Sequence, residues 1–450
     1  MRSRIRLERF ARVYVERATR EQTLPLFSLF SFVLAVLRGE RHVYYGWWLI
    51  AVGMGAVGIM SGVAIWSVTL YVEPLEAQFG WSRAEVALGP SMAALTGGLA
   101  SPFIGRWTDA KGPRRVILVG TLIAVGGFLL LATTDALWQW FFYNGLLGVG
   151  IALAYFIPFQ ALASRWFERR RGMAIGLLGV GISFGGIVVV PLVQVVIDAY
   201  DWEGAFIFSA ALMGIWMLPM VLFILRDSPA DVGALVDGAP LPPRHEPKQL
   251  TGIDLKSAAR TPLFWTLTLA IGLFFFGAFG WVVHAVPFYE SEGASDSLAV
   301  LLVVITVGAG AITRLAGGWI VDRTPSFEFL AMIMAGLGGL AMVSLLSAPG
   351  LIGVAPFVIL WSWSNIGPFM LEPLSLTRAF GVRHFATIAG AVTVMRTIFQ
   401  LLGPFAAGLI FDATGDYDWA LAMFVGSFGL SFLLFLVAMR LPRPAIAAPV

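Results

Sequence analysis

Three charged residues lie inside long apolar stretches of the chain: Arg314, Glu372 and Arg396. A charge at the centre of a membrane-spanning helix costs about 2.5–3.5 kcal/mol on insertion scales, so such a residue usually faces a partner or an aqueous cavity and serves a function. A guanidinium group is planar and binds a carboxylate through two parallel hydrogen bonds. Glu372 can pair with one arginine and leave the other for an anionic ligand. The residue types therefore predict a site for small carboxylates. In the alternative, Glu372 and one arginine form a pair that only holds helices together, and even then one arginine is left over.

The stretches around these residues predict a polytopic membrane protein. Hydrophobic residues make up 58% of the 450 positions and charged residues 13%, which is too apolar for a soluble globule of this length. Stretches of about 20 apolar residues, each long enough to cross a hydrocarbon core of about 30 Å, recur from Tyr45 onward. We count twelve of them. The predicted fold class is therefore an all-α membrane protein with twelve transmembrane helices.

The basic residues give an orientation. Of the 30 basic residues, 27 lie at the N-terminus or in alternate loops, and Arg83 is the one exception in an intervening loop. By the positive-inside rule both termini are cytoplasmic, which an even number of spans requires. We expect a multi-pass protein of the inner or plasma membrane. Its net charge of +3 reflects this bias and attraction to lipid headgroups, and does not indicate binding to nucleic acid.

The domain organisation follows from the positions of the apolar stretches. Residues 1–41 include seven arginines among the first 20 positions and predict a basic cytoplasmic extension with an interfacial helix, although a mis-assigned start codon is a rival interpretation. The remaining predicted parts are a six-helix bundle (42–225), a proline-containing cytoplasmic linker (226–261), a second six-helix bundle (262–440) and a cytoplasmic tail (441–450).

A short loop motif occurs once in each half. The loop after the second stretch begins Gly105-Arg-Trp-Thr-Asp109, and the loop after the eighth begins Gly318-Trp-Ile-Val-Asp322. In both loops a glycine lies four residues before an aspartate at the cytoplasmic end of a span. This resembles the signature loop of the major facilitator superfamily, whose two six-helix bundles rock about a central site. The resemblance implies the major facilitator fold and a gating role for loop residues Asp109, Arg115, Asp322 and Arg323.

Four further segments narrow the resemblance. They are Tyr45-Gly-Trp-Trp48, the segment Trp166-Phe-Glu-Arg-Arg-Arg-Gly-Met-Ala-Ile-Gly176, Gly403-Pro404 with Gly408 and Asp412, and Gly415-Asp-Tyr417. Together they are similar to the monocarboxylate transporter family and the bacterial oxalate:formate antiporters, over about residues 45–440. The chain departs from the pattern at Trp202-Glu203-Gly204, where family members often have Trp-Arg-Gly.

The resemblance implies roles for single residues. Arg314 lies where monocarboxylate transporters carry a substrate-binding arginine, and Arg396 lies where oxalate:formate antiporters carry a second cation. Tyr155 matches a cavity position of the family, although a packing tyrosine fits it equally well. Asn365 is a further polar candidate for the pocket. We therefore expect a small mono- or dicarboxylate as the substrate.

The usual proton carriers of the family are missing. Proton-coupled animal relatives have an acidic residue one helical turn before the arginine of span 8 and a lysine in span 1, and this chain has Gly310 and Trp66 at the matching positions. Glu372 and His284 are the remaining coupling candidates. For His284, a purely structural role is equally compatible. The expected function is secondary active transport by alternating access, as a proton symporter or an anion antiporter, with a proton or a counter-anion as the second partner.

Other function classes fit the sequence less well. An exporter of amphipathic drugs is the main alternative, but two buried cations and one acid favour anions. A membrane enzyme needs a nucleophile and base or metal ligands at membrane depth, and the chain has four histidines and no cysteine. We therefore expect no catalytic activity, no metal and no cofactor. The glycine series from Gly172 to Gly186 indicates close helix packing and not a nucleotide loop. A transporter-like sensor stays open.

Overall fold

A computed structural model describes residues 44–238, 250–324, 326–347, 350–365 and 367–444. The described secondary structure is helical, apart from one isolated bridge between Gly252 and Gly381. Contacts group residues 45–450 into one compact unit. The interfacial helix predicted within residues 1–41 lies outside the described residues, so it stays a prediction.

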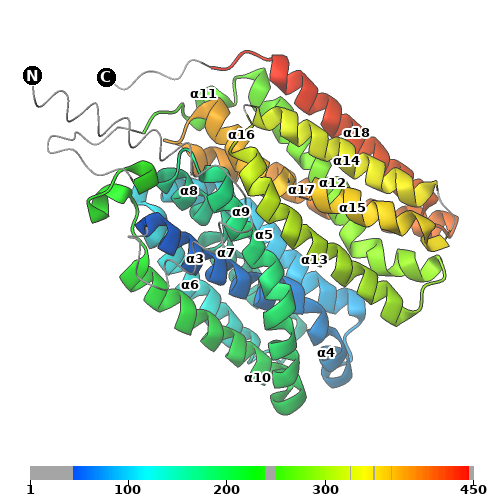
Figure 1. Ribbon diagram of the computed structural model, residues 1–450. Helices are drawn as coiled ribbons and strands as arrows, with labels where there is room; N and C mark the ends of the chain where they lie inside the picture. The colour runs from blue at the N-terminus through cyan, green and yellow to red at the C-terminus, as the bar shows by residue number, and fades with distance from the viewer. Residues whose placement is uncertain (1–43, 239–249, 325, 348–349, 366, 445–450) are drawn as a thin grey trace, which may run out of the picture. The chain divides into compact units, whose positions relative to one another are not determined.

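The first predicted bundle contains eight α-helices, with blue to green ribbons in Figure 1. Their bounds are α3 (Tyr45–Ser61), α4 (Val72–Phe79), α5 (Arg83–Lys111), α6 (Pro113–Leu131), α7 (Leu137–Ala154), α8 (Phe156–Trp166), α9 (Arg171–Phe184) and α10 (Val190–Pro219). Short π and 3-10 segments continue several of them: η1 (Gly62–Trp66), η2 (Ser67–Tyr71), η3 (Gly185–Val189) and η4 (Met220–Ile224).

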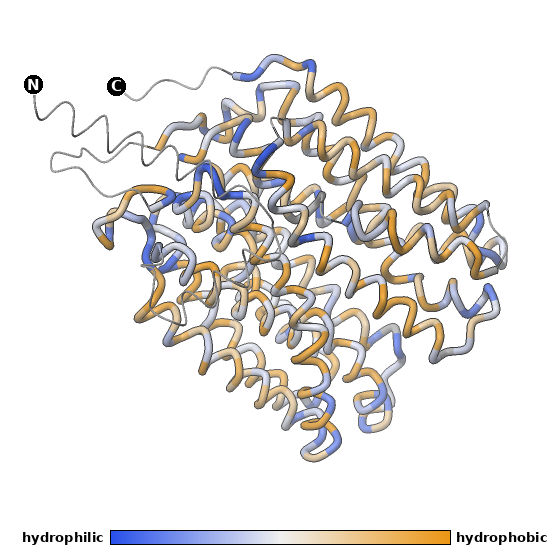
Figure 2. The backbone as a smooth tube through the Cα atoms, in the orientation of Figure 1, coloured by the Kyte–Doolittle hydropathy of each residue, from blue (hydrophilic) through white to orange (hydrophobic). Residues whose placement is uncertain are grey.

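The predicted linker contains η5 (Pro229–Val232), η6 (Val236–Gly238) and α11 (Leu255–Ala258). The second predicted bundle follows, with α12 (Pro262–Ser291), α13 (Asp296–Val321), α14 (Phe327–Leu346), η7 (Gly350–Gly353), α15 (Val354–Ser364), α16 (Gly367–Phe380), α17 (Phe385–Thr414) and α18 (Asp418–Arg440). Figure 2 shows apolar residues along the helices and hydrophilic residues gathered near the helix ends.

The described helices are those of a membrane protein. Nine helical stretches are long and apolar enough to cross a bilayer. One of them, Arg171–Ile224, has 54 residues and a kink at Tyr200 and Asp201, so its length suits two crossings. Helix α5 and the short helices α15 and α16 are not among the nine. The all-α class is thus confirmed, whereas the count of twelve spans, the bundle boundaries and the cytoplasmic termini stay predictions.

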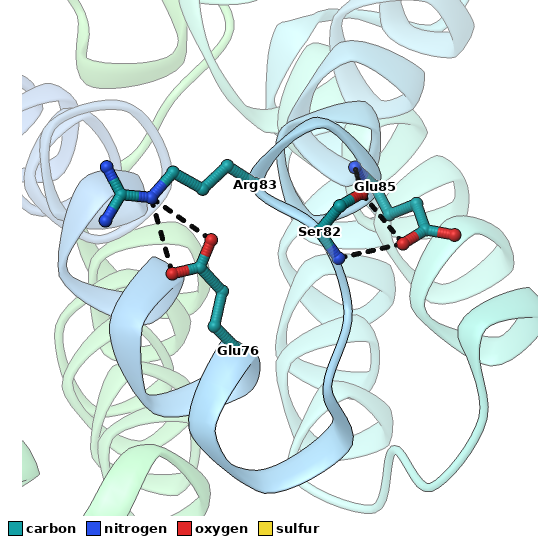
Figure 3. A network of polar contacts seen from close by, with 4 residues as sticks. All are labelled: Glu76, Ser82, Arg83 and Glu85. Carbon is teal, nitrogen blue, oxygen red and sulfur yellow. Dashed lines mark hydrogen bonds and ion pairs between the residues drawn. The ribbon is translucent and has the colours of Figure 1, made fainter.

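Helix α5 begins at a capping box in the loop after α4. The Glu85 backbone N–H donates to the Ser82 hydroxyl at 3.3 Å, and the Ser82 N–H donates to the Glu85 carboxylate at 2.8 Å (Figure 3). These bonds satisfy two backbone donors at the helix start. Arg83 pairs with Glu76 at 3.2 Å in the same loop, and exposed pairs of this kind contribute about 0–1 kcal/mol. The loop fixes the start of the helix that carries Asp109 near its other end.

Among the described residues, the two predicted halves meet mainly where α5 packs on α17 and α9 packs on α13, and smaller contacts join α9 to α16 and α8 to α17. Glycine allows the first pair to approach closely: a Cβ atom at Gly105 would collide with the Ala386 carbonyl, and one at Gly390 with the Ser101 carbonyl. Small residues permit such backbone contact between membrane helices. The pairs therefore bring the helices that carry Arg314 and Arg396 against the first half.

Candidate functional site

Arg314 lies at the contact between the predicted halves. Arg314 is 7% exposed, and its Nη1 atom donates a 2.6 Å hydrogen bond to the hydroxyl of Ser183. Arg314 belongs to α13 and Ser183 to α9. A charge-assisted bond between helices of different halves is strong when water is excluded. The arginine singled out from the sequence is therefore part of the surface on which one half meets the other.

The residue one helical turn before Arg314 is Gly310, and a side chain at this position would point toward the Arg314 guanidinium group. A Cβ atom at Gly310 would lie 3.8 Å from both Nη1 and Nη2 of Arg314. At this distance a short acidic side chain would contact the guanidinium group. Gly179 of α9 is also close, since a Cβ atom at this position would lie 3.6 Å from the Arg314 Cδ atom. Glycines of two helices thus border the Arg314 side chain, Gly310 at the guanidinium group and Gly179 at the Cδ atom.

Arg396 forms an ion pair with Glu372. The Nη1 atom of Arg396 on α17 lies 2.7 Å from the Oε2 atom of Glu372 on α16, and the two side chains are 17% and 3% exposed. The guanidinium also lies over the ring of Phe275, 4.8 Å from its centroid, as in a cation–π contact. Within the described part of the chain the buried Nε atom of Arg396 has no hydrogen-bond partner. Of the two arginines, Glu372 therefore pairs with Arg396.

Tyr155 joins the two arginines at the site. It lies at the break between α7 and α8, and its hydroxyl is 2.7 Å from the hydroxyl of Ser61. The Ser61 hydroxyl donates its proton to the Val57 carbonyl, so the Tyr155 hydroxyl is the donor in their contact. The phenol interacts electrostatically with both Arg314 and Arg396. Of the candidates from the sequence, the structure thus brings together Arg314, Arg396, Glu372 and Tyr155.

Asn365 and His284 do not share hydrogen bonds with this group in the described residues. Asn365 is the C-cap of α15, and its backbone N–H donates to the Trp361 carbonyl. The Nε2 atom of His284 lies 3.0 Å from the Pro404 carbonyl, and its Nδ1 atom lies 3.3 Å from the Tyr417 hydroxyl. A neutral imidazole that donates from Nε2 and accepts at Nδ1 satisfies both contacts. These bonds suit a structural role for His284.

Asp109 caps the start of a helix from the other half. Its carboxylate accepts hydrogen bonds from the backbone N–H of Ala386 at 3.2 Å, from the N–H of Thr387 at 2.7 Å and from the Thr387 hydroxyl at 2.7 Å. Ala386 and Thr387 form the first turn of α17. A carboxylate at this position satisfies free N–H groups and interacts favourably with the helix dipole.

Asp322 makes the reciprocal contact. Its carboxylate accepts from the N–H of Gly172 at 2.6 Å and from the N–H of Met173 at 3.0 Å, both in the first turn of α9. Burial raises the pKa of Asp322 from its ordinary value of 3.8 to about 6, despite the lowering effect of these bonds. Burial also raises the pKa of Asp109. Each motif aspartate therefore holds a helix of the opposite half.

The two loop arginines lie apart from these caps. Arg115 is exposed, and Arg323 is an exposed residue whose guanidinium lies 4.1 Å from the centroid of the Trp319 ring. Sequence analysis missed the neighbouring Arg114, whose side chain donates to the carbonyls of Val221 and Leu222. It also missed Ser61, Ser183 and Thr387, because single hydroxyl residues in apolar helices carry no signal of a distant partner.

The comparisons with known proteins identify the family of the chain. The family model of the Major Facilitator Superfamily matches residues 54–398. Monocarboxylate transporter 11 of Mus musculus is 28% identical over 423 residues, which covers 88% of each chain. The oxalate:formate antiporter of Oxalobacter formigenes is 24% identical over 419 residues, with 88% of this chain and 93% of the relative covered.

Solved structures show the same fold. The proton:xylose symporter XylE superposes with a TM-score of 0.70 at 15% identity, covering 87% of this chain and 95% of that chain. The transporter FucP in the outward conformation gives 0.67 at 13% identity, covering 86% and 98%. The predicted resemblance is confirmed, and the chain is a multi-pass membrane transporter and not an enzyme. It belongs to the Major Facilitator Superfamily.

Proposed function

We propose that this transporter carries small organic anions, mono- or dicarboxylates, by alternating access. The observation that carries the proposal is the placement of Arg314, a buried cation on the surface where the halves meet. A substrate bound there contacts both halves, so its binding can be coupled to their relative movement. The relatives named for monocarboxylates and for oxalate:formate exchange support the same substrate class.

The charges around the site favour an anion. The Arg314 and Arg396 guanidinium groups both interact electrostatically with Tyr155, and the carboxylate of Glu372 is bonded to Arg396. The three charges leave a net positive charge in a region that the membrane surrounds. A monocarboxylate bound to Arg314 would neutralise it. A dicarboxylate would suit both arginines if Glu372 became protonated and released Arg396. Tyr155 is the proposed neutral donor, which would turn its hydroxyl hydrogen from Ser61 to the substrate, and Asn365 is a further proposed pocket residue.

The aspartate caps supply the proposed gate. Asp109 and Asp322 each bond a helix of the opposite half at the end that we predict to be cytoplasmic. Both sets of bonds must break before the halves can separate there. We propose that Asp109 and Asp322 stabilise the state closed at this end, with Arg115 and Arg323 as flanking loop charges that face solvent. Substrate then enters from the opposite side of the membrane.

Coupling rests on Glu372 in this proposal. A carboxylate paired with one arginine at membrane depth can exchange its partner for a proton, which would make the protein a proton symporter. If Glu372 stays ionised through the cycle, exchange of one anion for another is the expected mode. His284 is the second candidate, although its contacts with the Pro404 carbonyl and the Tyr417 hydroxyl suit a structural role. The alternative of an amphipathic-compound exporter is not favoured, because the site carries two cations and one acid.

Transport into proteoliposomes tests the proposal. Purified protein would be reconstituted and supplied with radiolabelled lactate, pyruvate, oxalate or succinate, with and without a pH gradient and with and without unlabelled anion inside. We expect saturable uptake of at least one acid. Arg314→Ala should abolish uptake, and Arg314→Lys should weaken it, because lysine keeps the charge and loses the planar pair of donors.

The matched control is Arg83→Ala, which removes an exposed arginine of an outer loop and should leave uptake unchanged. Stimulation by the pH gradient would assign symport, and stimulation by internal anion would assign exchange. If no acid is transported by the wild-type protein, or if Arg314→Ala transports as well as the wild type, the carboxylate proposal is wrong.

A further inference from the structure

A small internal cavity lies within the second predicted half. Its volume is about 20 Å³. Helices α12, α14, α16 and α18 enclose it, and its lining residues are Ile271, Phe274, Phe275, Ala331, Leu371, Glu372, Ser375 and Phe435. Six of these side chains are apolar, and the other two are Glu372 and Ser375. The cavity therefore offers polar groups on one helix only, α16.

The hydroxyl of Ser375 is unsatisfied by the protein. Ser375 is 1% exposed, and its Oγ atom has no hydrogen-bond partner among the described residues. Most other buried serines of this half are satisfied, as shown by Ser431, whose hydroxyl donates to the Ala270 carbonyl at 2.8 Å. Buried polar groups without a protein partner commonly bind an internal water molecule. The orphaned hydroxyl thus points to an occupant of the cavity.

Glu372 and Ser375 are positioned to share that occupant. They are three residues apart on α16, so their side chains leave the helix on the same side, with Cβ atoms about 5–6 Å apart. A molecule that bonds both groups needs hydrogen bonds of about 2.8 Å to each. Both residues line the same small cavity, so one molecule inside it can bond the Ser375 hydroxyl and the Glu372 carboxylate.

The size and the charge of the cavity identify the occupant. A volume of about 20 Å³ exceeds the roughly 10–15 Å³ that one water molecule requires, and it is too small for a carboxylic acid. A metal cation is unfavourable, because the carboxylate of Glu372 is already neutralised by Arg396 at 2.7 Å and a second cation would be repelled. A neutral molecule that both donates and accepts hydrogen bonds satisfies all of these conditions.

We propose that a single water molecule occupies this cavity and bridges the Glu372 carboxylate and the Ser375 hydroxyl. The water donates one hydrogen to Glu372 and accepts the hydrogen of Ser375. Glu372 then has two separate partners, Arg396 and the water, and only the first lies at the proposed substrate site. The inference concerns the ligand-free protein, so it can be tested without knowing which anion is transported.

The sign of a stability change tests the proposal. If the water is present, Ser375→Ala removes one of its few anchors and leaves the water and Glu372 short of a partner, so the melting temperature should fall by several degrees. If the cavity is dry, the same substitution removes an unsatisfied buried hydroxyl, and the melting temperature should stay the same or rise. The measurement uses purified full-length protein in detergent without substrate.

Ser431→Ala is the matched control, since it removes a satisfied hydroxyl from the same half. It shows how far the melting temperature falls when a buried serine away from the cavity loses its hydrogen bond. Ala331→Val adds two methyl groups to the cavity wall on α14 and should destabilise the protein if it expels the water, but stabilise it if the space is empty. A structure at a resolution that shows ordered water decides directly. Density between Glu372 and Ser375 supports the proposal, and an empty cavity overturns it.

Discussion

The guanidinium of Arg314 on α13 bonds the hydroxyl of Ser183 on α9 at 2.6 Å, so a buried charge of the second half depends on a neutral residue of the first. A carboxylate that binds Arg314 is a stronger acceptor than this hydroxyl. Substrate binding would therefore replace or weaken the Ser183 contact. The two residues together link occupancy of the site to the fit between the halves.

Ser183→Ala should lower the melting temperature of the ligand-free protein and enlarge the stabilisation that a bound carboxylate produces. The reason is that the substitution removes one acceptor from a buried cation, and hydrogen bonds to charged groups contribute about 1.5–3 kcal/mol. Thermal shifts with and without anion measure both effects. Ser209→Ala is the control, because the Ser209 hydroxyl donates within its own helix. An unchanged anion response in Ser183→Ala would separate this serine from the binding site.

The ion pair of Arg396 and Glu372 predicts a non-additive pair of substitutions. Removing one member of a buried pair leaves an uncompensated charge and typically costs about 3–5 kcal/mol, whereas replacing both by apolar residues is often nearly neutral. Arg396→Met alone should therefore destabilise the protein strongly, and Arg396→Met with Glu372→Leu should restore much of the lost stability. Thermal unfolding of the singles and the double gives the coupling. Strictly additive effects would mean that the two side chains do not interact.

The cap at Asp109 predicts a change of conformation without a loss of affinity. Asp109→Ala removes the acceptor of three hydrogen bonds to the start of α17, and a charge at a helix N-terminus contributes up to about 2 kcal/mol. We expect the population open at this end to rise by about five- to thirtyfold. Thr387→Val is the graded control, because it removes only the hydroxyl bond and should have a smaller effect.

Spin labels can report this opening, because the chain has no cysteine of its own. Cysteines introduced at exposed Lys111 and Arg383 would place one label at the end of α5 and another before α17. The distance between them should lengthen in Asp109→Ala. A substitution that weakens anion affinity and leaves this distance unchanged would place Asp109 outside the proposed gate.

The raised pKa of Asp322 predicts that the equilibrium between the closed and the open state at this end depends on pH. The pKa is about 6 when the carboxyl is buried against α9 and should return toward 3.8 when opening exposes it. The closed state then binds the proton more tightly, so its stability increases as pH falls from above 6 toward 4. By linkage, the ratio of closed to open protein should rise about tenfold between pH 7 and pH 5.

The labelled pair at Lys111 and Arg383 measures this ratio as well. Asp322→Asn, which is neutral at every pH, should flatten most of the dependence. Asp109, whose pKa is also raised by burial, would account for a remainder in the same direction. A closed population that decreases on acidification would contradict the prediction.

Gly310 predicts a gain of acid sensitivity. A carboxylate introduced as Gly310→Asp would lie beside the Arg314 guanidinium, since the Cβ position is 3.8 Å from both terminal nitrogens. When ionised it should compete with a substrate anion, and when protonated it should leave Arg314 available. Uptake should therefore become strongly dependent on acidic pH. Gly310→Asn keeps the shape without the charge, and equal behaviour of the two variants would show that only bulk matters at this position.

The sequence was sufficient to predict the membrane class and the superfamily. Arg314, Glu372 and Arg396 stood out because an apolar helix makes any charge conspicuous. Which arginine pairs with Glu372 depends on how α16 and α17 pack, and no periodicity encodes that. The contributions of Ser61 and Ser183 are equally hidden, because hydroxyl residues are common in apolar helices.

The sequence analysis did not reveal interruptions inside the helical stretches. The stretch around Tyr155 is divided into α7 and α8 at that residue, and the stretch that begins at Tyr45 passes through π and 3-10 turns between Ser61 and Val72. The hydroxyls of Ser61 and Tyr155 lie 2.7 Å apart, so the two interruptions meet. Hydropathy averages over such positions and cannot reveal them.

The glycine contacts between α5 and α17 have a mechanical consequence. At Gly105 and Gly390 the facing surfaces are backbone against backbone, without the interlocking side chains that fix the register of most helix pairs. Further along the same pair, the Thr397 side chain of α17 packs against Gly98 of α5. We expect the backbone contacts at Gly105 and Gly390 to hinder a tilt of the halves less than interlocked side chains would, so that the aspartate caps at one end supply the main resistance to opening.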